Sequence, residues 1–131
     1  MESVLMELER RFAFAPYAPV IFVSAKTGQN IEHIFEVVDQ IWESRNKKIK
    51  TSELNKIIGS LNLTGKLPAK IFYATQTGSN PPRFWLFVKD PRDWHFSNVR
   101  FLDRELHQAF DLIGTPVKIY FKKPDNKSRL S

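Results

Sequence analysis

The sequence has no cysteine, only 5 glycines and no long apolar segment. Without cysteine the chain cannot form disulfides, zinc–thiolate sites or a thiol nucleophile. No apolar run approaches the ~18 residues that a membrane-spanning helix needs. The start of the sequence also lacks the basic and then apolar leader of a secreted protein. We therefore expect a soluble, cytoplasmic protein without a membrane partner.

Aromatic and charged residues are plentiful by contrast. The 131 residues are 42% hydrophobic and 13% aromatic, which suffices for a folded core of about one domain. The net charge of +6 favours a polyanionic or acidic partner. Residues 1–43 carry three basic and seven acidic side chains (net −4), whereas residues 44–131 carry 17 basic and seven acidic ones (net +10). We interpret the polar stretch 44–50, where the sign changes, as a linker, with a solvated helix end as the alternative.

The amino-terminal piece is predicted to fold as helix, strand and helix. Residues 4–12 carry a short apolar stripe, and the continuous apolar run 19–23 is typical of a strand covered on both faces. Asn30 is the predicted N-cap of a second helix. The apolar stripe of that helix is Ile31, Ile34, Phe35, Val38, Ile41 and Trp42. This pattern resembles the last strand and helix of an α/β unit whose other strands are absent.

The carboxy-terminal piece is predicted to be more complete. A helix capped by Thr51 or Ser52 comes first, followed by strands at 70–76 and 84–88. A second helix begins at an N-cap, Ser97, and stops at Gly114 as its C′ residue. The last strand, 117–122, alternates apolar with basic or tyrosine residues, so that one face is apolar and one basic. The order α-β-β-α-β predicts a three-stranded sheet with helices on one side.

Catalytic and metal-binding motifs are scarce. We interpret His33, His95 and His107 as isolated surface or cap histidines and expect no metal site. Residues 59–66 imitate a phosphate-binding loop, but five residues instead of four separate the two glycines, and Leu67 replaces the Mg²⁺-binding hydroxyl. We assign three aromatic residues to packing in the core or on the sheet face, in preference to base stacking: Phe72, Tyr73 and Trp85. The chain by itself is therefore not expected to be an enzyme.

The short motif Ser24–Ala25–Lys26 has a more informative context. It follows an apolar run and precedes a helix, which is where the last nucleotide-contacting loop of Ras-like GTPases lies. In such a loop, the backbone N–H at the position of Ala25 bonds to the guanine carbonyl.

Five blocks support a resemblance that covers nearly the whole chain: 18–28, 51–55, 70–76, 81–88 and 114–116. In this order they resemble the carboxy-terminal end of the bacterial Der (EngA) family, GTPases with two tandem GTPase domains. The resemblance implies that residues 1–46 are the truncated tail of the second GTPase domain. Residues 47–131 are then a KH-like domain of α+β class, preceded by the strand-helix remnant of an α/β GTPase domain. GTP and Mg²⁺ would be cofactors of the parent protein, with none in this fragment.

The same resemblance implies a role in assembly of the large ribosomal subunit. Two classes of function remain open for the chain itself. It could contact the ribosomal RNA of that subunit, or it could dock on the first GTPase domain of the parent and sense the nucleotide state of that domain. No two glycines are three apart, so the Gly-x-x-Gly clamp of RNA-binding KH domains is missing. Phosphate contacts would then depend on a set of lysines, namely Lys47, Lys48, Lys50, Lys118, Lys122 and Lys123.

The apolar residues of the amino-terminal piece lead to a further expectation. A strand and a helix without their sheet expose an unpaired edge and an apolar face. We expect residues 1–43 either to be poorly ordered or to pack against a second copy of the chain, while residues 51–122 fold independently. The alternative is that this piece folds back on the KH-like domain within one monomer.

Overall fold

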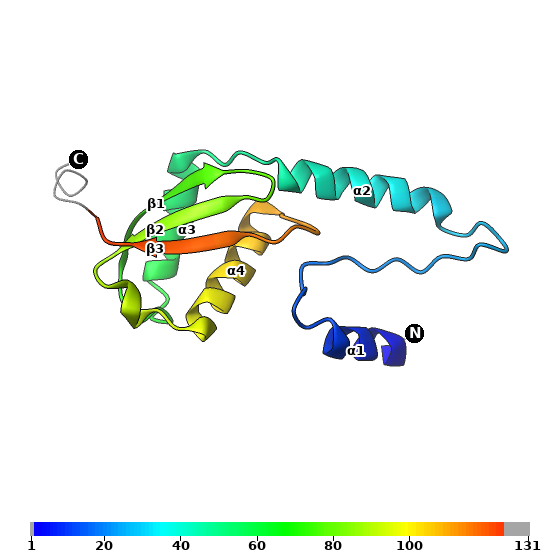
Figure 1. Ribbon diagram of the computed structural model, residues 1–131, viewed down its shortest axis with the longest axis horizontal. Coiled ribbons are helices and arrows are strands. Elements are labelled where there is room, and N and C mark those ends of the chain that lie inside the picture. Colours follow the sequence, from blue (N-terminus) through cyan, green and yellow to red (C-terminus); the bar gives the residue numbers. More distant parts are fainter. Residues whose placement is uncertain (1, 125–131) are drawn as a thin grey trace.

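The computed structural model describes residues 2–124 (Figure 1). Its helices are α1 (Glu2–Arg11), α2 (Ile31–Arg45), α3 (Thr51–Asn62) and α4 (Phe96–Phe110), and its strands are β1 (Ile71–Gly78), β2 (Arg83–Val88) and β3 (Lys118–Lys122). A short 3₁₀ turn, Pro91–Asp93, precedes α4. The order α3-β1-β2-α4-β3 confirms the α+β arrangement predicted for the carboxy-terminal piece. Within the described residues, no helix combines the length and the apolar character needed to cross a membrane.

The three strands form one mixed sheet in the order β1-β2-β3. β1 and β2 pair antiparallel, whereas β2 and β3 pair parallel and are connected through α4. A register shift between Ile71 and Tyr73 marks a bulge in β1. Phe72 and Tyr73, at this bulge, are both about half exposed, at 49% and 45%.

α3 and α4 cover one face of the sheet and pass behind the strands in Figure 1. The inward residues are Leu54, Ile58 and Leu61 of α3, Leu102, Leu106 and Phe110 of α4, and Ile71, Ala74, Phe84, Leu86 and Val88 of the sheet. Helical spacing of three or four residues and strand alternation put these side chains on one side of their elements. The predicted sheet with helices on one face is therefore confirmed. Among residues 2–124, no helix covers the other face.

Side-chain amides pair with the outer edge of β1. Asn55 of α3 accepts from the Ala74 N–H and donates to the Ala74 carbonyl, both at 2.8 Å. Asn62, two turns along the same helix, makes the same pair of bonds with Ile71 at 2.9 Å. Gln76 accepts from the Ile49 N–H and donates to the Lys47 carbonyl. The Asn55 and Asn62 amides occupy backbone groups that an edge strand would otherwise offer to another chain, whereas Gln76 ties the linker to β1.

Two of the three predicted N-caps are wrong. Asn30 is the N-cap residue of α2 as predicted, but its backbone is left-handed with φ 62° and its amide donates to the Phe22 carbonyl instead of bonding to the helix. α3 follows Lys50, so both Thr51 and Ser52 lie inside the helix. α4 follows His95, whose N–H donates to Asn98 Oδ1, so Ser97 is also helical. Which residue caps a helix depends on the local path of the backbone, and composition alone does not reveal that path.

The end of α4 also differs from the prediction. The left-handed residue after the helix is Asp111, with φ 53°, and not Gly114. Gly114 also has a positive φ of 74°, and it lies so close to α2 that a Cβ there would collide with the Ile41 side chain. Both features favour glycine at this position. Close by, Ser44 Oγ donates to the Asp111 carbonyl at 3.5 Å. The last turns of α2 therefore pack against the loop that follows α4.

The strand predicted at 19–23 does not form. These residues are an irregular segment in which Val20 and Val23 are about half exposed. Among the described residues no strand lies beside the segment, so its backbone N–H and C=O groups have no ladder partner. The helix predicted after it is confirmed as α2. Phe35, Val38 and Trp42 of its apolar stripe remain exposed.

Candidate nucleic-acid interface

The guanine-loop motif lies in an exposed turn between the irregular segment and α2. Gly28 N–H donates to the Ser24 carbonyl at 2.8 Å, and the Ser24 N–H donates to the Gln29 carbonyl at 3.1 Å. Ala25 and Lys26 are exposed. The residues that imitate a phosphate loop lie elsewhere, at the end of α3 and in the turn after it. Within residues 2–124, the structure therefore does not bring residues 59–66 to the Ser24–Lys26 turn.

The three linker lysines are not equivalent. Lys47 Nζ donates to the Phe110 carbonyl at 2.6 Å, at the carboxyl end of α4. An ammonium at a helix carboxyl end satisfies a terminal carbonyl and the helix dipole. Lys48 and Lys50 are exposed. Lys47 therefore has a structural role on the helix-covered side of the sheet.

Lys118 and Lys122 lie on β3 and point away from the helices. Their neighbours Ile119 and Phe121 pack against the core, which confirms the predicted apolar and basic faces of this strand. Lys122 Nζ lies 3.6 Å from the centroid of the Trp85 ring, a cation–π contact. Lys123, the next residue, is exposed. Hydrogen bonds from Arg92, with smaller help from the charge of Lys123, lower the pKa of the Asp90 carboxyl to about 2.

Several aromatic residues of the sheet lie on this same uncovered face, while Phe84 and Phe121 face the core. Tyr73 on β1 and Phe87 on β2 are register partners whose ring centroids are 6.0 Å apart. Trp85 on β2 pairs with Tyr120 on β3. Neither Tyr73 nor Trp85 enters the core, so the predicted core position is wrong for both and they lie on the sheet face. Tyr120 was not singled out from the sequence, although its place between two lysines of an alternating strand indicates an outward position.

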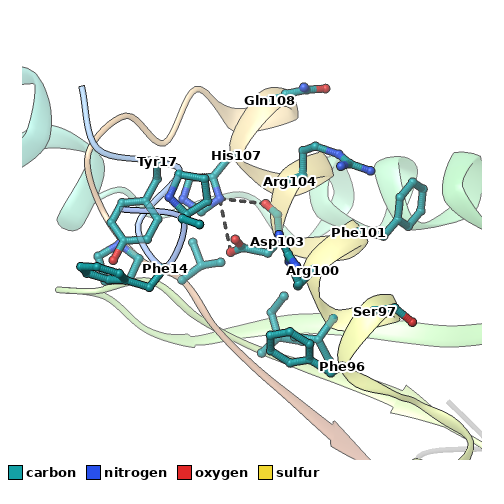
Figure 2. A pocket seen from close by; sticks show the side chains of 16 residues that line it. Phe14, Tyr17, Phe96, Ser97, Arg100, Phe101, Asp103, Arg104, His107 and Gln108 are labelled. Carbon is teal, nitrogen blue, oxygen red and sulfur yellow. Dashed lines mark hydrogen bonds and ion pairs between the residues drawn. The ribbon is translucent and has the colours of Figure 1, made fainter. Parts of the chain in front are cut away.

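A groove of about 1020 Å³ lies on the other side of the domain, between residues 13–17 and α4 (Figure 2). Phe14 and Phe96 line it and are both 76% exposed. The Tyr17 ring stacks on His107 with centroids 5.6 Å apart, and the Tyr17 carbonyl accepts from the Gly114 N–H. These contacts hold the chain before the irregular segment against the KH-like domain.

His107 is the residue on which the sequence interpretation fails. It is half-buried, and Asp103 lies one helical turn before it. Its Nδ1 is 2.8 Å from the Asp103 carbonyl and 3.3 Å from Asp103 Oδ1, and its Nε2 is 2.6 Å from the Thr115 carbonyl (Figure 2). Burial alone lowers the pKa of His107, but these hydrogen bonds outweigh it and raise the pKa to about 9.

Asp103 and His107 are four residues apart on a helix, and this spacing could have indicated their contact from the sequence. His33 likewise lies 3.0 Å from Glu36, on the exposed side of α2. His95 precedes α4 as its cap residue. Surface and cap positions were the two roles predicted for the histidines. Across residues 2–124, no group of three side chains able to hold a metal ion comes together.

The sheet order, the two helices on one face and the uncovered face with its lysines define a KH-like α+β domain. The family model for the KH-domain-like carboxy-terminal region of EngA bacterial GTPase enzymes matches residues 48–122. The chain is 43% identical to the GTPase Der of Caldanaerobacter subterraneus subsp. tengcongensis, over 88% of this chain and 28% of that protein. It is 39% identical to the GTPase Der of Clostridium acetobutylicum, over 96% of this chain and 30% of that protein.

The GTPase Der of Lactobacillus acidophilus is similar to the same degree, with 41% identity over 89% of this chain and 28% of that protein. This chain belongs to the Der (EngA) family of GTPases. It spans less than a third of the length of these curated relatives.

Proposed function

We propose that this chain is the carboxy-terminal portion of a ribosome-assembly GTPase and contacts the ribosomal RNA of the large subunit through its phosphates. The observation that carries the proposal is the net charge of +10 over residues 44–131, next to a net charge of −4 over residues 1–43. Lysine side chains neutralise phosphates and release condensed counterions, which supplies sequence-independent affinity. The chain alone is not catalytic in this proposal.

The geometry narrows the set of phosphate-binding lysines. Lys118 and Lys122 share one face, and Lys48 and Lys50 are exposed, so these four are available to phosphates. Lys47 is held by the Phe110 carbonyl, and Lys123 lies after the last residue of β3, outside the strand face. The order of importance is therefore Lys118 and Lys122 first, then Lys48 and Lys50, with Lys47 and Lys123 last.

The test measures the affinity of the chain for large-subunit ribosomal RNA as a function of salt. Four lysine contacts predict a slope of log K against log salt of roughly −3. Lys118→Gln is expected to make the slope shallower by about 0.7, whereas Lys26→Gln, in the guanine-loop turn, serves as the control and leaves it unchanged. An affinity that is the same between ~50 and ~200 mM salt contradicts the proposal.

A second candidate function is docking on the first GTPase domain of the parent protein. The observation that favours it is the groove between residues 13–17 and α4, where Phe14 and Phe96 expose most of their surface. Aromatic side chains of this kind are enriched in protein–protein interfaces. This candidate predicts binding of the separately produced GTPase domain that is weakened by Phe96→Ser and is nearly independent of salt.

A further inference from the structure

We propose that the uncovered face of the sheet is a stacking surface for single-stranded RNA, an inference that rests on the RNA contact proposed above. The residues of this face are termed the open-face set. They are Tyr73, Thr75 and Thr77 of β1, Arg83, Trp85 and Phe87 of β2, and Lys118, Tyr120 and Lys122 of β3. The set contains four aromatic rings, three cations and no carboxylate.

Strand register arranges the open-face set in rows. Thr75, Trp85 and Tyr120 form one row across the three strands. Tyr73, Phe87 and Lys122 form the next, and Arg83 pairs with Lys118 at the end. Neighbouring strands are about 4.8 Å apart, and the ring centroids of Tyr73 and Phe87 are 6.0 Å apart, so the rings of this face lie on adjacent strands and together form a platform. Aromatic rings therefore lie on all three strands, with two cations on β3 and the third, Arg83, at the start of β2.

A hollow of about 440 Å³ lies within this platform and is lined by Thr77, Arg83, Trp85, Tyr120 and Lys122. Trp85 supplies a flat apolar surface there, and Lys122 Nζ lies over it. An exposed cation–π contact is weaker than the stacking of a base on an aromatic ring. An arriving base can therefore displace the ammonium of Lys122, which then becomes free to pair with a phosphate of the same strand.

Arg83 also lines the hollow. Its guanidinium lies across Gly78 of β1, where a Cβ would collide with it. Glycine at this position leaves room for the guanidinium beside the sheet. A planar guanidinium can bind a phosphate with two hydrogen bonds or stack on a base.

The composition of the face favours RNA over a protein partner. Lysines are depleted in the cores of protein–protein interfaces, because their charge must be desolvated. Here Lys118 and Lys122 border the aromatic rings, with no carboxylate in the open-face set to neutralise them. Single-stranded RNA matches both features, since it offers unstacked bases and phosphates, whereas a duplex keeps its base faces internal.

The experiment uses the full chain and a fluorescently labelled 12-nucleotide uridine-rich RNA, single-stranded or annealed to its complement. Trp85→Leu is expected to weaken single-strand binding roughly 5- to 150-fold without changing the salt slope. Tyr120→Leu is expected to weaken it in the same way, and Tyr120→Phe to retain affinity because the ring remains. Phe96→Leu, on the helix-covered side of the domain, is the matched control and is expected to bind as the unmodified chain does.

Several results distinguish this inference from the proposal on which it rests. If the duplex binds as tightly as the single strand and Trp85→Leu binds normally, the stacking surface is refuted while the phosphate contact stands. If neither RNA binds at any salt concentration, both are refuted. If Trp85→Leu abolishes binding of the separate GTPase domain and leaves RNA affinity intact, the face is a protein interface and the inference fails. Tyr120→Phe and Tyr120→Leu decide the matter should Trp85→Leu fail to fold.

Discussion

At the scale of single residues, His107 shows how a polar contact can join distant parts of this chain. Both ring nitrogens face oxygen acceptors, the Thr115 carbonyl on one side and Asp103 on the other. A neutral imidazole can donate only once, so it would leave one of these acceptors facing a lone pair. The protonated ring satisfies both, and it stacks on Tyr17 from the amino-terminal piece.

This geometry predicts a pH-dependent stability. The ordinary pKa of 6.5 is raised to about 9 in the folded chain, so the folded state binds the proton more tightly. The stabilisation is complete below pH 6.5 and is lost as the pH rises through 9. With solvent weakening the contacts of a half-buried ring, we expect the free energy of unfolding to fall by roughly 1–3 kcal/mol between pH 6 and pH 9.

Denaturant unfolding at both pH values measures this loss, and NMR titration of the ring gives the pKa directly. His107→Gln is expected to remove most of the pH dependence, and Asp103→Asn to lower the pKa of His107. A ring that titrates near 6.5 in the folded chain would contradict the interpretation.

Asn55 is the second residue whose role depends on two bonds made together. Its amide forms a matched pair of hydrogen bonds with the backbone of Ala74. Asn55→Ala leaves a partly buried N–H and C=O without partners, and we expect a loss of about 2–4 kcal/mol in the free energy of unfolding. Lys56→Ala, at the next and exposed position of α3, is the control and is expected to change stability by less than about 0.5 kcal/mol. Equal effects of the two substitutions would refute the edge-pairing role.

At the scale of elements, the turn that contains Ser24, Ala25 and Lys26 resembles one part of a nucleotide site without the others. Phosphate contacts provide most of the anchoring of a nucleoside triphosphate, through a glycine-rich loop, its lysine and Mg²⁺. The sequence holds no phosphate loop with the required spacing. We therefore expect no measurable binding of GTP and no hydrolysis by this chain. Isothermal titration that detects micromolar affinity for GTP would show this expectation to be wrong.

At the scale of the whole molecule, the helices of the amino-terminal piece leave much apolar surface exposed. Met6 of α1, and Phe35 and Trp42 of α2, are 70%, 70% and 62% exposed, while Ile41 packs at Gly114. Burying a large apolar side chain contributes ~1.5–3 kcal/mol, so these residues favour association. We expect the chain to self-associate at micromolar concentration through residues 1–43.

Light scattering over a concentration series tests this association. Phe35→Glu and Trp42→Glu together are expected to give a monomer with an unchanged KH-like domain. Thr64→Glu, in the turn after α3, is a matched control because it adds a charge at an exposed position outside the amino-terminal piece. A strict monomer whose residues 2–43 are well protected from hydrogen exchange would favour the folded-back alternative.

The sequence by itself determined the elements with strong periodicity and the distribution of basic side chains along the chain. The stripes of α2, α3 and α4, the three strands of the sheet and the lysines on β3 all follow from spacing, because side-chain direction repeats with a fixed period in helices and strands. The five ordered blocks also suffice for the family resemblance. Helix ends do not follow from spacing, and the cap residues of α3 and α4 were predicted wrongly.

Only the tertiary structure decided the features that join residues far apart in the sequence. The segment 19–23 has the composition of a strand, yet it forms none because a strand requires partners for its backbone groups. Trp85 and Tyr120 become neighbours only through the parallel pairing of β2 and β3. His107 acquires its second acceptor from Thr115 only when the chain turns after α4. Local propensity depends on neighbours in sequence, whereas these contacts depend on neighbours in space.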